Sequence, residues 1–233
     1  MLSRRPLLLG LAVLALAGPL EAQEFPAEAR RFVEAMIAEL SAIEAREKDE
    51  ARRRAALDEA LRNRVALARI GRFMLGASRT RASPAELAEY DRLIPGFILA
   101  DVRGEIAKLV AQSIAIDEVQ ARSARDALVR SRFRRRAGGT VRVDWRVAAA
   151  EGQPLQLVDV YVNGVSRFVI RRDEFQAIVK ARGMAGLLAE LGKGVAGSAS
   201  RAGPGPRLAS AGRGGYRPTD RRHLGSAAER GQA

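Results

Sequence analysis

The sequence predicts an α+β fold, with an antiparallel sheet of three to five strands wrapped by about six or seven helices. Strand patterns lie near residues 126–135, 140–148 and 156–162, and short links join them, so consecutive strands should pair antiparallel. Apolar residues at three- and four-residue spacing fill residues 27–112 and recur after the strands. Such stripes are typical of helices that cover one face of a sheet.

The clearest strand signal lies in residues 141–147. Valine and tryptophan occupy every second position there, with charged residues between them, so one face of the strand is apolar. After the strand near 156–162, Asn163 and Gly164 favour a tight turn, and Ser166 stands where the N-cap of a helix belongs. A weaker strand is expected over residues 113–119.

The helices before the sheet are marked by their ends as well as by periodicity. Ser83 and Glu86 form a capping box, with Pro84 at the first helical position. Gly76 favours the end of the preceding helix, and the Pro-Gly pair at 95–96 is expected to break or kink the next one. About five helices are therefore expected before the sheet.

Composition divides the chain into three parts. Residues 1–22 combine two arginines with an apolar run too short for a comfortable membrane span, as in a cleavable secretion signal. Residues 23–192 are long enough for one domain with a sizeable core, and the helical pattern over 173–192 is divided at Gly183. Residues 193–233 are rich in Gly, Ala and Arg without periodicity, so a disordered basic tail is expected.

The residues that carry chemistry argue against an enzyme. The chain has no cysteine, and its one histidine, His223, lies in the basic tail, so a histidine triad, a metal centre or a bound cofactor is not expected. Asp144 and Asp159 are candidates for paired carboxylates. Asp144 shares a strand face with Arg142 and Arg146, which favours ion pairs, and Asp159 is expected to make a structural hydrogen bond or to pair with an arginine.

Seven short segments follow, in order, a pattern shared with a known family. They are Arg72-Phe73-Met74-Leu75-Gly76, Ala82-Ser83-Pro84-Ala85-Glu86, Val129-Arg130-Ser131-Arg132, Val143-Asp144-Trp145-Arg146, Val158-Asp159-Val160, Gly164-Val165-Ser166 and Arg172-Asp173-Glu174-Phe175. In these segments the chain resembles the MlaC family of periplasmic lipid-binding proteins, also called the toluene-tolerance family. It departs from the family pattern at Asp101 and Val102, where relatives often have tyrosine, and lacks the tryptophan that usually opens the strand near residue 156.

The resemblance implies a soluble periplasmic carrier that holds the acyl chains of a phospholipid, or of a hopanoid-type lipid, in an apolar pocket. It also implies two partners, an outer-membrane complex and an inner-membrane ABC transporter, between which the lipid is shuttled. Inward strand positions and facing helix stripes would then form the pocket walls: Phe73, Met74, Phe97, Val143, Trp145, Val158, Val160 and Phe175. The same residues would also suit an ordinary filled core, and periodicity does not separate the two.

A second class of function follows from charge. The net charge is +13, and Arg130, Arg132 and Arg134 share one strand face, as do Arg142 and Arg146 on the next strand. The alternative is therefore a secreted polyanion-binding protein, although such a face is more often simply solvated. The expected secretion signal and the shortage of aromatic residues in the tail make nucleic acid an unlikely partner. A weaker third possibility is an enzyme that acts on a lipid.

Overall fold

The computed structural model describes residues 21–108, 111–135 and 138–200, which form five α-helices, one 3-10 helix and five strands. In chain order these are α1 (Glu21–Arg46), α2 (Glu50–Arg62), α3 (Leu67–Leu75), η1 (Gly76–Arg81), α4 (Pro84–Lys108), β1 (Ala111–Ser123), β2 (Asp126–Arg135), β3 (Thr140–Ala148), β4 (Gln156–Val162), β5 (Val165–Ser166) and α5 (Arg167–Ser200). The predicted α+β class is confirmed, with fewer helices than expected. Residues 1–20 of the expected signal and 201–233 of the expected tail lie outside the described residues.

The sheet is a meander in which each strand pairs antiparallel with the next, in the order β1-β2-β3-β4-β5. Its three central strands have the bounds that the strand patterns of the sequence predict. Trp145 on β3 pairs with Val129 on β2 and with Val160 on β4, and all three are buried on one face, which we call the inner face. Asn163 and Gly164 form the turn into β5 with φ values of 51° and 83°, as a type I′ turn requires.

β4 contains a bulge that changes which residues face inward. Arg146 pairs with Asp159, but the next residue on β3, Val147, pairs with Leu157. Val158 is therefore an extra residue in β4 and is only partly buried. Leu157 occupies the inward position that we expected Val158 to hold, and its side chain is fully buried.

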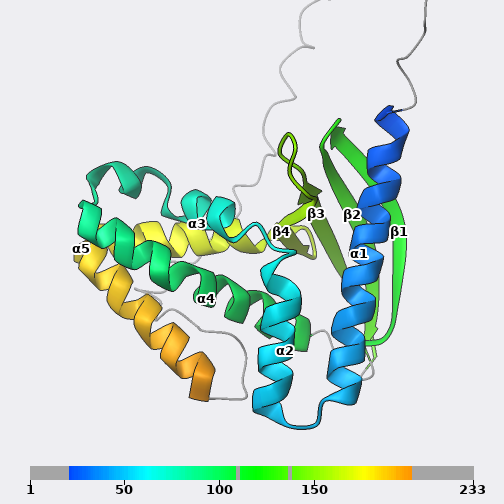
Figure 1. The fold of residues 1–233 in the computed structure, drawn as a ribbon, viewed down its shortest axis with the longest axis horizontal. Helices are drawn as coiled ribbons and strands as arrows, with labels where there is room; N and C mark the ends of the chain where they lie inside the picture. The colour runs from blue at the N-terminus through cyan, green and yellow to red at the C-terminus, as the bar shows by residue number, and fades with distance from the viewer. Residues whose placement is uncertain (1–20, 109–110, 136–137, 201–233) are drawn as a thin grey trace, which may run out of the picture.

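The helices cover the sheet in two groups (Figure 1). α1 lies along β1 and β2 and buries an apolar stripe that runs from Ala29 through Val33 and Met36 to Ile43. α3, α4 and α5 pack on one another beside β3 and β4, and α2 packs on α1 and α4. The buried side chains of both groups and of the sheet form one continuous core.

α4 is one continuous helix, although the Pro-Gly pair at 95–96 was expected to break it. Pro95 removes one backbone hydrogen bond, but the residues on both sides of it are buried against α3 and α5. These are Leu93, Ile94, Phe97 and Ile98. Their burial outweighs the local cost, which is about 3 kcal/mol for a proline in a helix interior.

α5 begins after Ser166, whose Oγ accepts a hydrogen bond from the backbone N–H of Val169 at 3.0 Å, so the predicted N-cap is confirmed. The helix bends at Gly183, where φ is 67° and ψ is −176°. Its two arms form a V in Figure 1. It continues to Ser200, eight residues past the boundary expected at residue 192. No helix in the described part of the chain is long and apolar enough to cross a membrane.

Candidate functional site

An apolar seam lies between the inner face of β3 and β4 on one side and the end of α4 and the start of α5 on the other. Five apolar residues and three charged ones line it: Val102, Ile106, Trp145, Val160 and Phe168, with Asp101, Glu105 and Arg167. The side chains close the seam to an open volume of about 10 Å³. That is close to the smallest space that can hold one water molecule.

The sequence brings these residues together through simple spacing rules. Asp101 and Glu105, four residues apart on α4, share one helix face, and Val102 and Ile106 repeat the same spacing one position further. Trp145 and Val160 are direct cross-strand partners on β3 and β4. The seam therefore lies where one face of α4 packs against a cross-strand pair on β3 and β4.

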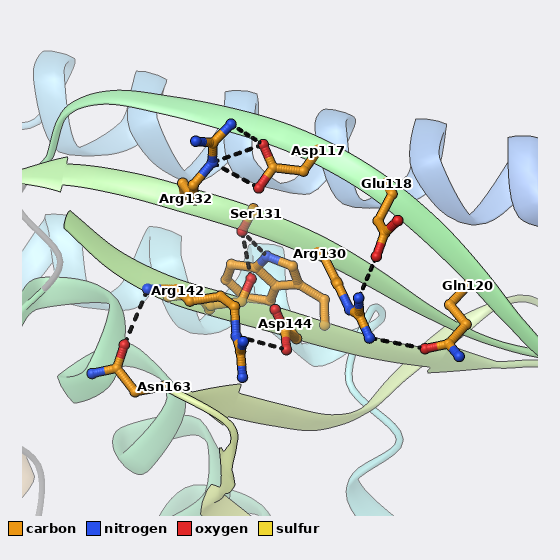
Figure 2. A network of polar contacts seen from close by, with 11 residues as sticks. Asp117, Glu118, Gln120, Arg130, Ser131, Arg132, Arg142, Asp144 and Asn163 are labelled. Carbon is orange, nitrogen blue, oxygen red and sulfur yellow. Dashed lines mark hydrogen bonds and ion pairs between the residues drawn. The ribbon is translucent and has the colours of Figure 1, made fainter.

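The indole of Trp145 is held in place by a hydrogen-bond relay within the sheet. Its Nε1 donates to the Oγ of Ser131 at 3.0 Å, and this hydroxyl donates to the backbone carbonyl of Val143 at 2.6 Å (Figure 2). Ser131 is fully buried, so the relay satisfies polar groups that water does not reach. Trp145 is the single tryptophan of the chain and its ring faces the seam in a fixed position.

The start of α5 is fixed to β4 by a buried carboxylate. Asp159 accepts hydrogen bonds from the Ser166 hydroxyl at 2.6 Å and from the backbone N–H of Val160 at 2.8 Å. Burial raises the pKa of Asp159, although these hydrogen bonds lower it in part. The expected structural role of Asp159 is thus confirmed, and the contact positions Arg167 and Phe168 at the seam.

Opposite charges on α4 and α5 meet at the seam. Arg167 Nη2 lies 2.8 Å from Glu105 Oε1 and 3.5 Å from Asp101 Oδ1. One turn further along α5, Arg171 Nε donates to Asp101 Oδ1 at 2.9 Å, and Arg171 also pairs with Glu174. Burial alone would lower the pKa of Arg171, but the charge of Asp101 and its hydrogen bond raise it, so the guanidinium stays charged.

The family of the chain is shown by comparison with known proteins. The model of the MlaC protein family matches residues 30–193, which is most of the chain. The chain belongs to the MlaC family. Its fold is similar to a solved structure of a phospholipid-binding protein from Ralstonia solanacearum in complex with a phospholipid, with 20% sequence identity and a TM-score of 0.61. That likeness covers 73% of this chain and 98% of the other, and no curated protein matches.

Of the eight pocket residues expected from the MlaC pattern, Trp145 and Val160 line the seam. Met74, Phe97 and Phe175 are fully buried in the helical group, where the rings of Phe97 and Phe175 meet edge to face at 5.4 Å. These three support the helices rather than line the seam. Val143 is fully buried on the inner face as expected, but it is also absent from the seam lining, as is Val158 in the β4 bulge.

Phe73 lies at the surface of this MlaC-family protein rather than in a pocket. It is 40% exposed, and the guanidinium of Arg172 lies 5.1 Å from the centre of its ring. Ile70 and Met74, four residues apart, form the buried face of α3, so the helical period turns Phe73 outward. The family motif includes this segment, but the motif alone does not tell which of its residues face inward.

The sequence-based prediction missed the charged part of the seam. Asp101 was noted only as a departure from the family pattern, and Glu105 and Arg167 were not singled out. A signal was present, because the acidic pair 101/105 and the basic pair 167/171 each have the four-residue spacing that aligns side chains on a helix. Only the packing of α4 on α5 shows that the two pairs face one another.

The basic outer face of the sheet is largely neutralised by carboxylates. Arg132 pairs with Asp117 at 2.7 Å, and Arg130 pairs with Glu118 on the neighbouring strand (Figure 2). Further along β3, Arg146 pairs with Asp126 at 2.6 Å rather than with Asp144. These contacts favour a solvated, ion-paired face over a surface prepared for a polyanion.

Asp144 is buried beneath these arginines and is 4% exposed. Its Oδ2 lies 3.4 Å from Arg142 Nε, as the shared strand face predicts, and its Oδ1 has no hydrogen-bond partner. Burial raises the pKa of Asp144. Asp159 is occupied by Ser166, so the two carboxylates have separate structural contacts and do not form a paired acid–base site.

A wider groove of about 620 Å³ lies between η1, the start of α4 and the kink of α5. Its lining includes Ser78, Arg81, Glu86, Gln176 and Lys180, which are polar or charged. Gln176 and Glu86 already serve the fold, because Gln176 donates to the carbonyl of Leu75 and Glu86 closes the capping box at Ser83. The smaller seam is the better candidate for an apolar ligand.

Within the described residues no group of three side chains suited to a metal ion occurs.

Proposed function

We propose that this protein is a periplasmic lipid carrier that holds acyl chains in the seam between the sheet and the helices. The observation that carries the proposal is the apolar wall of Trp145, Val160 and Phe168 in an MlaC-family fold. A phospholipid is bound in the similar structure from Ralstonia solanacearum, which supports the same class of ligand here. No covalent chemistry is required of the residues at the seam.

Acyl chains need more space than the seam offers, so binding requires the walls to separate. β3 and β4 are held by hydrogen bonds to their neighbours in the sheet, and Asp159 on β4 holds the start of α5, whereas the end of α4 meets the seam through side chains. The end of α4 is therefore the part of the wall that would move. Burying the chains against aromatic and aliphatic side chains supplies about 0.8 kcal/mol per methylene group, which offsets the cost of opening.

We further propose that the carrier shuttles its lipid between an outer-membrane complex and an inner-membrane ABC transporter, as the MlaC resemblance implies. A carrier of this kind would need to shield the acyl chains during transit, and a seam between the sheet and the helices, lined mostly by apolar side chains, would do so. The alternative hypothesis is a polyanion-binding protein. The ion pairs on the outer face of the sheet argue against it, because they occupy the arginines that a polyanion would contact.

The direct experiment is mass spectrometry of an organic extract from the full chain purified out of a bacterial periplasm. Stoichiometric phospholipid, or a hopanoid-type lipid, is the expected result. Protein that carries no lipid, and takes none up from vesicles, would contradict the proposal. Co-purified nucleic acid with steeply salt-dependent binding would instead favour the polyanion reading.

Val160→Trp tests whether the seam is the binding site. The larger side chain fills the seam from the sheet side, so bound lipid should fall below about a tenth of the wild-type amount, while the lipid-free protein keeps most of its stability because the helical wall can move. Val147→Trp is the matched control, since Val147 lies on the same inner face but outside the seam. There the added volume should cost about 1–3 kcal/mol in the free energy of unfolding by urea. If Val160→Trp unfolded the protein or left lipid uptake intact, the seam would not be the site.

A further inference from the structure

The arginines of α3 and η1 differ from those of the sheet, because no carboxylate pairs with them. Residues 67–81 contain four arginines and no acidic residue, α5 contributes two further cations, and all six side chains are exposed. In the part of the chain that the structure describes, none of the six forms an ion pair: Arg69, Arg72, Arg79, Arg81, Arg172 and Lys180. We call these six the basic strip. Surface cations without a carboxylate partner are available to an anionic binding partner.

Contacts between α5 and the elements α3 and η1 bring these cations together. Arg172, Gln176 and Lys180 follow one another at four-residue intervals and so lie along one side of α5. The guanidinium of Arg172 lies 5.1 Å from the centre of the Phe73 ring, and Gln176 donates to the last carbonyl of α3 at 2.8 Å. Further along, Lys180 and Arg81 line the same groove. The three elements lie side by side (Figure 1), so the strip is continuous across them.

Exposed apolar side chains occur at the same place. Among the described residues, three large apolar side chains are exposed, those of Phe73, Val165 and Val169, at 40%, 53% and 44%. Phe73 contacts Arg172, and Val169 lies three residues before Arg172 on the exposed side of α5. Val165 lies in β5, directly before α5. Basic residues beside exposed apolar side chains are typical of protein surfaces that enter the interface of a bilayer.

The balance of charge decides which partner fits this surface. Two carboxylates without an ion pair lie near the strip, Glu86 in the groove and Asp173 beside Arg172 on α5. Six cations therefore face two carboxylates, and a second copy of this chain would be repelled here. The core of a protein–protein interface is depleted of charged residues, whereas here cations surround the apolar side chains. A layer of anionic lipid headgroups matches such a surface better than an acidic protein does.

We propose that the basic strip, together with Phe73 and Val169, is a docking surface for an anionic phospholipid bilayer. The guanidinium groups bond to lipid phosphates, and the two apolar side chains enter the headgroup layer. This contact is made with the bilayer surface and needs no lipid in the seam, so it goes beyond the proposed function. The first residues of α5 also line the seam, so docking would hold the seam close to the bilayer.

Sedimentation with vesicles measures the docking. The full chain is mixed at low salt with vesicles of phosphatidylcholine alone, or of equal parts phosphatidylcholine and phosphatidylglycerol. It should bind only the anionic vesicles, and added salt should weaken the binding. Each basic residue at an anionic bilayer strengthens binding about fivefold, so the triple variant Arg69→Gln, Arg72→Gln and Arg172→Gln should bind about a hundredfold more weakly.

A second triple variant controls for net charge. Arg52→Gln, Arg92→Gln and Arg132→Gln remove the same charge from exposed arginines that are ion-paired on other surfaces. Its binding should stay within about twofold of the wild type, because charges far from the bilayer are screened. Both variants keep the arginines of residues 201–233, so a difference between them arises in the strip. Equal binding by the two variants would overturn the proposal, and circular dichroism checks that both are folded.

Phe73→Trp tests whether the partner is a bilayer or a soluble polyanion. On anionic vesicles the emission of the added tryptophan should shift to shorter wavelength and become protected from acrylamide, after subtraction of the wild-type signal from buried Trp145. With polyglutamate or heparin no shift is expected. Tight binding to these polymers, with no shift on vesicles, would mean an acidic protein or polyanion site and would overturn the bilayer assignment. Lipid retention without vesicle docking would defeat this inference alone, whereas docking without lipid retention would defeat only the proposed function.

Discussion

At the scale of single residues, the seam depends on the hydroxyl of Ser131. Trp145 brings a large apolar ring to the wall, but its N–H has to be satisfied inside the sheet, and Ser131 does so from the neighbouring strand. In the alternating pattern of β2, Ser131 falls on the same side as Ala127, Val129 and Phe133, opposite the arginines. The pattern did not predict the contact, because hydrogen-bond partners depend on the register between strands.

Ser131→Ala should lower the free energy of unfolding by about 1–3 kcal/mol, because the indole N–H is left buried and unpaired. Urea unfolding followed by the fluorescence of Trp145, the single tryptophan, measures this directly. Ser113→Ala on β1 is the control, since Ser113 is exposed and the change should have almost no effect. Equal stability of the two variants would show that the relay contributes nothing.

Asp144 is a buried carboxylate of which one oxygen pairs with Arg142 and the other has no hydrogen-bond partner. It should therefore make the free energy of unfolding depend on pH. Its folded pKa is raised above the ordinary value of 3.8, because burial disfavours the charged form. Between these two pKa values the folded state binds more protons than the unfolded state, so stability falls as pH rises through that interval. Above the raised pKa, Asp144 is charged in both states, and the full cost of burying its charge lowers the stability of the folded state.

Asp144→Asn should therefore stabilise the protein at pH 7, and its advantage should shrink as the pH falls towards 3.8. Thermal melts across this range measure the difference between variant and wild type. Asp91→Asn, at an exposed position of α4, serves as the control. A wild type that is more stable than Asp144→Asn at pH 7 would mean that the Arg142 ion pair outweighs the cost of burial.

At the scale of elements, strands were easier to predict than helix continuity. Alternation over β2 and β3 predicts a sheet with one buried face, and the apolar run of β4 predicts a third strand, so the bounds of all three could be given. Pro95 predicted an interruption of α4 from local backbone chemistry, whereas burial of Phe97 and its neighbours kept the helix continuous. Local rules fail where packing on both sides of a residue is stronger than the local preference.

The kink of α5 is an element-scale feature that the sequence did signal. At Gly183 the backbone has φ 67° and ψ −176°, a region that is essentially limited to glycine. A Cβ there would have no neighbour within 4 Å, so any loss on substitution comes from the backbone alone. The Arg182–Glu190 ion pair spans the kink at 3.1 Å and favours the bent form.

Gly183→Ala should lower the free energy of unfolding by about 1–3 kcal/mol, through backbone strain or through straightening of α5. Gly192→Ala is the matched change in the second arm of the same helix, where a Cβ also meets nothing. There alanine should raise stability by about 0.5–1 kcal/mol, because it favours the helical backbone. Chemical denaturation of both variants gives the comparison, and effects of the same sign would argue against a backbone origin.

At the scale of the whole molecule, the fold class and the family were within reach of the sequence, whereas the site was only partly so. Trp145 and Val160 were identified from strand alternation and family motifs together. The charged residues of the seam were not, because Asp101 and Arg171 are seventy positions apart and only the packing of α4 on α5 joins them. Contacts of this kind leave a periodic signal on each helix but no signal that links the helices.

The basic tail should be dispensable for folding. Residues 201–233 are rich in Gly, Ala and Arg and contain few large apolar residues, so they can bury little surface. Because α5 continues to Ser200, the truncation is placed after that residue. Calorimetry should show a melting temperature within about 2 °C of the full chain, since a change of 1 kcal/mol would shift it by roughly 2–4 °C in a protein of this size. A larger fall would mean that the tail packs on the domain.

The meander order of the sheet also governs the order in which the chain can fold. Each strand pairs with the next, so the loops that close the sheet are short, whereas Gln176 on α5 bonds to Leu75, 101 residues away. Short loops lose less entropy on closure, so the hairpins can form first and α5 docks on α3 and α4 last. The last element to dock can also be the first to detach, and native-state hydrogen exchange should find α5 opening while β2 and β3 stay protected. The proposed carrier would then release its lipid through a partial unfolding of one helix, with the sheet intact throughout.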